Sequence, residues 1–133
     1  DEWEKIERII QQFTNRVRNN KSFYRIMQRE QLHMSNPQIV EILKQTKRFF
    51  LNTYAKILQS GMEKGIFTKN PPIYLLHSTV SGTLFYASNS IEMYQDFLEI
   101  EHSKQDFEEI YFKELIQHIK YILKDLLGYE ENK

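Results

Sequence analysis

The longest amphipathic pattern in the chain runs from residue 37 to residue 65. Its apolar residues recur at steps of three and four, which places them on one side of an α-helix. They are Ile39, Ile42, Leu43, Phe49, Phe50, Tyr54, Ile57, Leu58 and Met62. Ser35-Asn36-Pro37 provides start signals, and Gly65 followed by Ile66 provides a stop of the Schellman type. We predict one helix of roughly 42 Å, against which shorter helices pack.

Two helices are predicted before the long one. Between residues 1 and 19, one stripe repeats at steps of three and four, and its members are Trp3, Ile6, Ile10, Phe13 and Val17. The charged residues beside it, including Glu2 and Arg16, are assigned to the solvent side. A shorter helix from about Ser22 to Leu32 is expected to bury Phe23, Ile26 and Met27.

The second half of the chain is more apolar. Asn70-Pro71-Pro72 starts a helix that is predicted to end at about Ser90, with hardly a charge between Lys69 and Glu92. A polar connector is predicted from Ile91 to Gln105. The last helix, from about Lys104 to Leu127, has a broad apolar arc and stops at Gly128. A helix that is apolar all round is buried on all sides, so part of these surfaces needs a further partner.

These elements predict an all-α fold, a helical bundle of about five helices in one domain that spans residues 1–133. The last two helices predict an isologous homodimer with a four-helix interface; the alternative is a monomer in which both helices lie deep in the core. From helix faces we expect the interface to contain Leu75, Gly82, Phe85, Tyr86, Leu115, Ile119, Ile122 and Leu126. We predict that Gly82→Leu weakens dimerisation, because a glycine lets two helices approach closely.

Composition narrows the classes of partner. The chain has 18 basic and 18 acidic residues, so no net charge attracts nucleic acid or an anionic membrane. No apolar run approaches the ~20 residues of a membrane span, so no membrane partner is expected. There is no cysteine, which fits a reducing, cytoplasmic compartment. The sequence starts at Asp1 rather than Met, which predicts that a longer protein contains it.

The sequence holds no recognisable catalytic or metal-binding constellation. Its four histidines show no ligand spacing, and we predict no metal and no cofactor. His77 and Ser78 are adjacent, so their side chains point apart on a helix, and no carboxylate is placed to orient the imidazole. Glu114 and His118, at i and i+4, are interpreted as an ordinary helix pair. We therefore predict that the chain is not an enzyme.

The order of parts resembles a known family. Phe23-Tyr24-Arg25-Ile26-Met27-Gln28-Arg29-Glu30 is followed by Gly61-x-x-x-Gly65-Ile66-Phe67, and then by Asn70-Pro71-Pro72 and an apolar helix with Gly82. This is similar to the C-terminal effector-binding and dimerisation domain of TetR-family transcriptional regulators. The resemblance implies that the last two helices dimerise and that a small hydrophobic or amphipathic effector binds inside. It also implies a helix-turn-helix domain upstream of Asp1, through which alone DNA is bound.

Aromatic residues are in surplus on the inward helix faces, with a few polar groups on the apolar helix. This favours a small-molecule pocket between helices, although a closely packed core would give the same pattern. The residues that we expect to line the pocket are Phe13, Val17, Phe23, Met27, Phe50, Tyr54, His77 and Ser81. Two other classes stay open: a stand-alone helical module that binds small molecules or lipids, and, less favoured, a helical-bundle enzyme.

Overall fold

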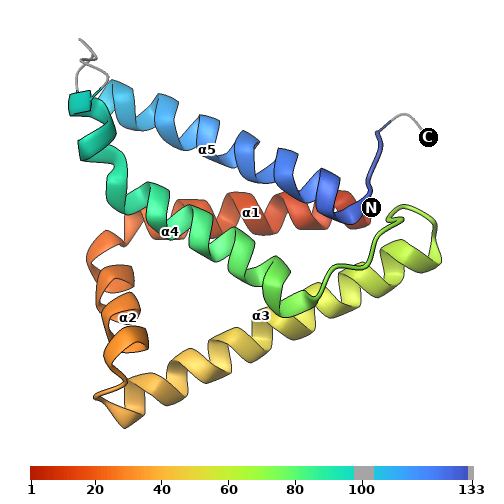
Figure 1. Cartoon of the computed structure of the whole chain (residues 1–133), viewed down its shortest axis with the longest axis horizontal. Helices are drawn as coiled ribbons and strands as arrows, with labels where there is room; N and C mark the ends of the chain where they lie inside the picture. The colour runs from red at the N-terminus through yellow and green to blue at the C-terminus, as the bar shows by residue number, and fades with distance from the viewer. Residues whose placement is uncertain (98–103, 132–133) are drawn as a thin grey trace.

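The computed structural model describes residues 1–97 and 104–131. In these two ranges the chain forms five α-helices and no strand, as predicted (Figure 1). The helices are α1 (Glu2–Asn19), α2 (Lys21–His33), α3 (Pro37–Glu63), α4 (Ile73–Phe97) and α5 (Lys104–Leu127).

Helix α1 is the centre of the bundle and packs against each of the other four helices. The predicted stripe from Trp3 to Val17 is buried as one face. Figure 1 shows α5 above α1 and α4 crossing in front of α1, from beside α3 to the start of α5, while α2 and α3 form an open angle below. Within the described residues, no helix is both long and apolar enough to cross a bilayer.

The two ends of α3 are closed as the sequence predicts. The side chain of Asn36 accepts hydrogen bonds from the amides of Gln38 and Ile39, which caps the helix N-terminus. At the other end Gly65 has a φ of 71°, and the amide of Ile66 donates to the carbonyl of Gly61 at 2.8 Å. This is a Schellman motif, which satisfies carbonyls that a helix C-terminus otherwise leaves free.

Gly61 has a packing role that the sequence does not reveal. The ring of Phe67, which is 2% exposed, lies directly over it. A Cβ atom at position 61 would stand 2.2 Å from that ring, so only glycine fits there without a shift. The glycine thereby lets the loop between α3 and α4 fold back onto the helix that precedes it.

The predicted boundary between the fourth helix and the connector was wrong. Helix α4 continues past Ser90 to Phe97, and Ile91 is buried in the core. Polar residues such as Glu92 and Gln95 occur after Ser90, but a change to polar residues does not stop a helix when no proline or glycine interrupts it. The remainder of the predicted connector includes residues 98–103, which lie outside the described residues.

Glu2 was assigned to solvent, and this was wrong as well. Its side chain is 1% exposed, because the end of α3 lies over the start of α1. The Lys64 ammonium donates to Oε1 of Glu2 at 2.7 Å, and the Ser60 hydroxyl donates to the same oxygen at 3.0 Å. The hydrogen bond from Lys64, together with that from Ser60, lowers the pKa of Glu2 to about 2.

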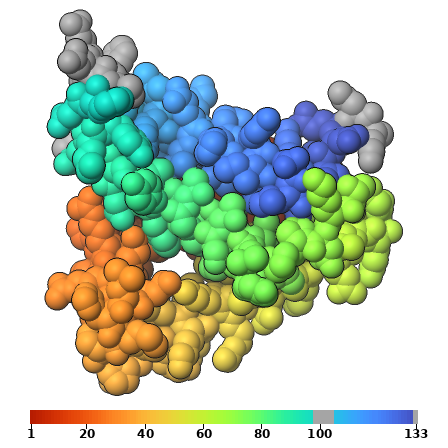
Figure 2. All heavy atoms as spheres, viewed as in Figure 1, coloured from red at the N-terminus to blue at the C-terminus, as the bar shows by residue number. Residues whose placement is uncertain are grey.

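The largest difference from expectation concerns α2. None of its residues is buried; Phe23 is 52% exposed and Ile26 is 54% exposed. In α3 the first buried residue is Tyr54, so the apolar residues of its first half, such as Phe49, are also largely uncovered. Figure 2 shows α2 and the adjoining end of α3 as a lobe beside the body formed by α4 and α5.

Candidate ligand-binding pocket

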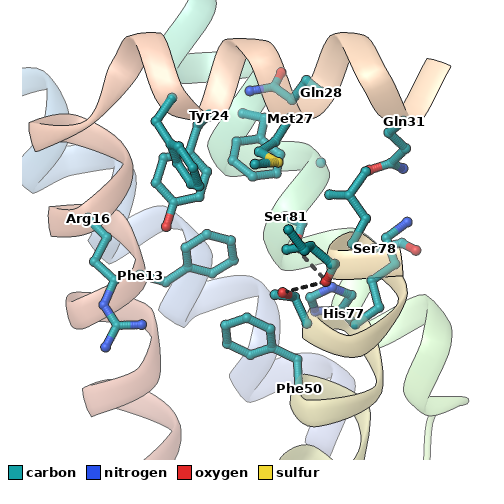
Figure 3. Close-up of a pocket in the computed structure, with 17 residues that line it drawn as sticks. Phe13, Arg16, Tyr24, Met27, Gln28, Gln31, Phe50, His77, Ser78 and Ser81 are labelled. Atoms are coloured by element: carbon teal, nitrogen blue, oxygen red, sulfur yellow. Dashed lines mark hydrogen bonds between the residues drawn. The ribbon is translucent and has the colours of Figure 1, made fainter. Parts of the chain in front are cut away.

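A cavity of about 400 Å³ lies among α1, α2, α3 and α4 (Figure 3). This volume falls in the range of small-molecule sites, about 300–1,000 Å³. The residues that line it are Phe13 and Arg16 from α1; Phe23, Tyr24, Met27, Gln28 and Gln31 from α2; Ile42, Leu43, Thr46, Lys47 and Phe50 from α3; and His77, Ser78, Ser81, Gly82 and Phe85 from α4.

Aromatic rings form one wall of the cavity, and Phe13 lies at their centre. Its ring stacks on Phe50 with centroids 5.3 Å apart, and meets Phe85 edge-to-face at 5.7 Å. Tyr24 of α2 contacts both Phe13 and Phe85, at 6.3 Å and 5.9 Å. These contacts join α1, α2, α3 and α4 around one apolar surface, which suits a flat or flexible apolar ligand body.

His77 supplies a polar group beside this wall. Its ring stacks on Phe50 at 5.4 Å, and its Nε2 lies 3.4 Å from the hydroxyl oxygen of Ser81. Its Nδ1 is buried, with no hydrogen-bond partner among the described residues. Burial lowers the pKa of His77, and the positive charge of Lys47 lowers it further. A neutral imidazole offers one donor and one acceptor, so it can orient a polar ligand group.

Tyr54 lies next to this site, with its ring centroid 6.0 Å from that of His77. The residue is fully buried, and its hydroxyl has no hydrogen-bond partner among the described residues. Burial raises the pKa of Tyr54 to about 12, which keeps the phenol neutral. Tyr54 therefore belongs to the core beneath the cavity rather than to its lining.

The structure brings most of the predicted pocket residues together. Those that line the cavity are Phe13, Phe23, Met27, Phe50, His77 and Ser81. Val17 and Tyr54 are buried and do not line it. That these side chains bind a ligand stays a prediction.

Sequence reasoning missed two cationic lining residues: Arg16 was assigned to solvent, and Lys47 was not considered. A signal was available in the spacing. Arg16 follows Phe13 by three residues and Lys47 precedes Phe50 by three, and residues three apart share a helix face. The three-residue spacing from an aromatic residue of the predicted pocket could therefore have identified both cations as lining residues.

The residues expected at a dimer interface do not form one outer surface. Leu115 and Ile119 are buried in the core of the same chain, because the apolar arc of α5 packs against α1 and α4. Phe85 and Gly82 line the cavity, while Ile122 and Leu126 are partly buried. Leu75 and Tyr86 are exposed, at 53% and 70%.

Among the described residues, the exposed large apolar side chains of these two helices overlap with the expected interface only at Leu75 and Tyr86. They are Tyr74, Leu75, Tyr86, Met93, Tyr94 and Phe97 of α4 and Ile110 and Tyr121 of α5. Among them, Leu75, Tyr86, Met93 and Phe97 repeat at helical spacing on one face of α4. Any contact with a second chain through α4 and α5 would use this face rather than the buried side of α5.

The cavity offers no catalytic or metal-binding arrangement in the described part of the chain. No group of three or more His, Asp or Glu residues is close enough to hold a metal ion. None of the 17 lining residues is acidic, so no carboxylate of the lining orients His77 toward Ser81. The pair has the geometry of a binding group rather than of a nucleophile and its base.

Fold and cavity together define a class: an all-α bundle with a cavity of about 400 Å³ between its helices. The comparison with protein families is specific, since residues 3–123 match the family described as "Tetracyclin repressor-like, C-terminal domain". The chain belongs to this family. Domains of this kind are regulatory and are typically dimeric and effector-binding. No curated protein and no solved structure matches the chain.

Proposed function

We propose that the chain is the effector-binding and dimerisation domain of a TetR-like transcriptional regulator in the cytoplasm. Its effector is a small hydrophobic or amphipathic molecule that occupies the cavity and changes DNA binding by a helix-turn-helix domain of the same protein. The observation that carries the proposal is the cavity itself, an aromatic wall with the His77–Ser81 pair beside it. Family membership supports the regulatory role.

The helix contacts suggest how a ligand in the cavity could change the position of the DNA-binding domains. Helix α1 supplies Phe13 and Arg16 to the cavity and also contacts every other helix. A ligand that binds better to one arrangement of α1 against α2 and α3 shifts the population toward that arrangement. At its start α1 is tied to the end of α3 through Glu2 and Lys64, so the two helices move together there. Operator affinity changes when this movement alters the spacing of two DNA-binding heads in a dimer.

A methionine probe tests whether ligands occupy the cavity. Of the four methionines only Met27 lines it; Met34, Met62 and Met93 lie elsewhere. With ¹³C-labelled methionine methyl groups, we expect hydrophobic and amphipathic compounds to shift the Met27 resonance selectively. Gly82→Leu should abolish the shift, because position 82 lines the cavity and a side chain there has open space to fill.

Two results would contradict the proposal. One is a compound set that shifts Met93 or Met62 while Met27 stays unchanged. The other is operator binding by the full-length protein that ignores every compound bound by this chain. The second result would favour a helical module that binds small molecules without control of DNA binding.

Dimerisation through the outer face of α4 is tested separately. We expect Tyr86→Glu to convert a dimer into a monomer in sedimentation equilibrium, because it places a charge in a desolvated interface. Phe49→Glu is the matched control: it also replaces an exposed aromatic residue, but in α3, and should leave the mass unchanged. Gly82→Leu is a less clean test, since position 82 also lines the cavity. A monomeric native chain, or a Tyr86→Glu variant of unchanged mass, would remove this interface.

A further inference from the structure

The charged side chains that line the cavity are all positive. Among its 17 lining residues are two permanent cations, Arg16 and Lys47, and no Asp or Glu. The whole chain is balanced, with 18 basic and 18 acidic residues, so the imbalance is local to the cavity. An uncompensated positive potential in a partly enclosed apolar site attracts anions and repels cations.

Neither cation has a carboxylate partner in the part of the chain that the structure describes. The described residues show no ion pair for Arg16 or Lys47, although other basic residues such as Arg18 and Lys64 have carboxylate partners at 2.7–3.2 Å. Both unpaired side chains are solvent-accessible at the cavity margin. In Figure 3, Arg16 lies on one side of the Phe13 and Phe50 rings, and His77 with Ser81 lies on the other. Arg16 and the His77–Ser81 pair thus lie on opposite sides of the two rings.

The side with His77 contains more groups suited to an anionic headgroup. Ser81 Oγ and His77 Nε2 are 3.4 Å apart, and Lys47 lies close enough for its charge to lower the pKa of His77. When His77 Nε2–H donates to Ser81 Oγ, the Ser81 hydroxyl is free to donate to an oxyanion, and the Lys47 ammonium supplies further donors. The other hydroxyls nearby are less free, since Ser78 and Thr46 donate to carbonyls of their own helices.

An aromatic cavity also attracts cations, through the faces of the rings, so the two effects have to be weighed. Here Phe13 and Phe50 stack on each other and Phe50 stacks on His77, which leaves less ring face for a ligand. A cationic ligand would also meet Arg16 and Lys47 with no carboxylate of the lining to offset them. The lining therefore offers a cation two like charges and few free ring faces, whereas it offers an anion two opposite charges.

We propose that the effector is an amphipathic organic anion, whose apolar body lies along the Phe13–Phe50 wall and whose oxyanion headgroup is held by Lys47 with Ser81 and His77. This rests on the proposed function, because it names the chemistry of the ligand for the same cavity. The carboxylate of an aryl or alkyl acid fits this description. Arg16 adds attraction from the other side of the wall without contacting the headgroup.

Three probes with one apolar body test the charge preference: 2-naphthylacetate, 2-(2-naphthyl)ethanol and 2-(2-naphthyl)ethylammonium. Binding is measured by titration calorimetry, and occupancy of the cavity by the shift of the Met27 methyl resonance. We expect the anion to bind about fivefold or more tighter than the alcohol, and the ammonium to bind weakest. Lys47→Gln should remove about fivefold of the anion's affinity and leave the alcohol unchanged.

Lys44→Gln is the matched control, since Lys44 is an exposed lysine on the same helix that does not line the cavity. It should leave all three affinities unchanged. Probes that shift Met27 while the alcohol or the ammonium binds tightest would overturn the anion preference and leave the proposed function standing. Equal losses in Lys47→Gln and Lys44→Gln would overturn the placement of the headgroup. If no probe shifts Met27, the anion inference and the proposed pocket fail together.

Discussion

Two regions of the molecule differ sharply in how their apolar residues are used. The packed end comprises α1, α4, α5 and the part of α3 from Tyr54 onward; the open end comprises α2 and residues 37–53 of α3. Both carry apolar residues at helical spacing, yet α1 buries one complete face while α2 buries no residue. A periodic pattern shows which side chains share a face of a helix, but not whether another element covers that face.

The cavity lies at the boundary between these two regions, and both regions contribute to its lining. Its aromatic wall begins in the packed end with Phe13 and Phe85 and is completed by Tyr24 from the open end. Segments with few buried contacts open locally at low cost. Under the proposed function, a ligand at this boundary would change how the open end packs on the packed end without disturbing the core.

The largest expected effect comes from the same substitution made in each region. Leu84 of α4 is fully buried, whereas Leu32 of α2 is 83% exposed. We expect Leu84→Ala to lower the free energy of unfolding by about 3–5 kcal/mol, through lost burial and the cavity that remains. Leu32→Ala should change it by less than about 0.5 kcal/mol. Urea unfolding followed by circular dichroism measures both, and similar losses would show that the open end is covered in solution.

Gly61 gives a smaller effect and concerns how the packed end is closed. Gly61→Ala would place a methyl group against the buried ring of Phe67, and we expect a loss of about 1–3 kcal/mol in the free energy of unfolding. Gly82→Ala is the control, since its added Cβ meets nothing within 4 Å. Because alanine favours a helix over glycine, the control should be neutral or stabilising by up to about 1 kcal/mol. A harmless Gly61→Ala would contradict the close approach of the loop.

Glu2 predicts a pH dependence for the packed end. Its pKa in the folded chain is about 2, compared with 4.5 for an unperturbed glutamate. A lowered pKa stabilises the fold above about pH 4.5, and this stabilisation is lost as the pH falls toward 2. Glu2→Gln should therefore have a lower melting temperature than the native chain at pH 7, and the gap should close toward pH 2. Glu41→Gln, at an exposed position on α3, should show no such gap.

The number of helices and most of their ends could be predicted because their signals are local; the end of α4 at Phe97, which carries no such signal, could not. Asn36 with Pro37, the Gly65–Ile66 pair and Gly128 each act within a few residues of the chain, and the structure confirms them. Tertiary features could not be read in this way. Glu2 is buried by Ser60 and Lys64, which are about 60 residues away along the chain, and the sequence around Glu2 does not predict these partners.

The candidate site shows the same division. His77 and Ser81 were predicted to line a pocket because a few polar groups on the apolar helix accompany the surplus of inward aromatic residues, and both line the cavity. Leu115 and Ile119 were expected at an interface because the arc of α5 is broad, yet α1 and α4 of the same chain cover it. Breadth of an apolar arc measures how much surface must be covered, not which chain covers it.

The smallest expected effect tests how the open end is attached. The amide of Asn89 in α4 donates to the side-chain oxygen of Gln28 in α2 at 3.0 Å, which is a polar link between the two regions. Gln28→Ala removes this link at an exposed site, where a hydrogen bond contributes roughly 0.5–1 kcal/mol. We therefore expect amide hydrogen exchange in α2 to become about two- to fivefold faster, with α1 unchanged.

Gln31→Ala is the appropriate comparison, because Gln31 also lies on α2 and also lines the cavity, but its side chain makes no hydrogen bond to the described residues. In this variant the rate of amide hydrogen exchange in α2 should equal that of the native chain. If Gln28→Ala accelerated α1 and α2 alike, the two regions would open as one unit, since exchange reports the cooperative unit that contains each amide. The boundary at the cavity would then not separate two levels of stability, and a ligand there would act on the whole bundle.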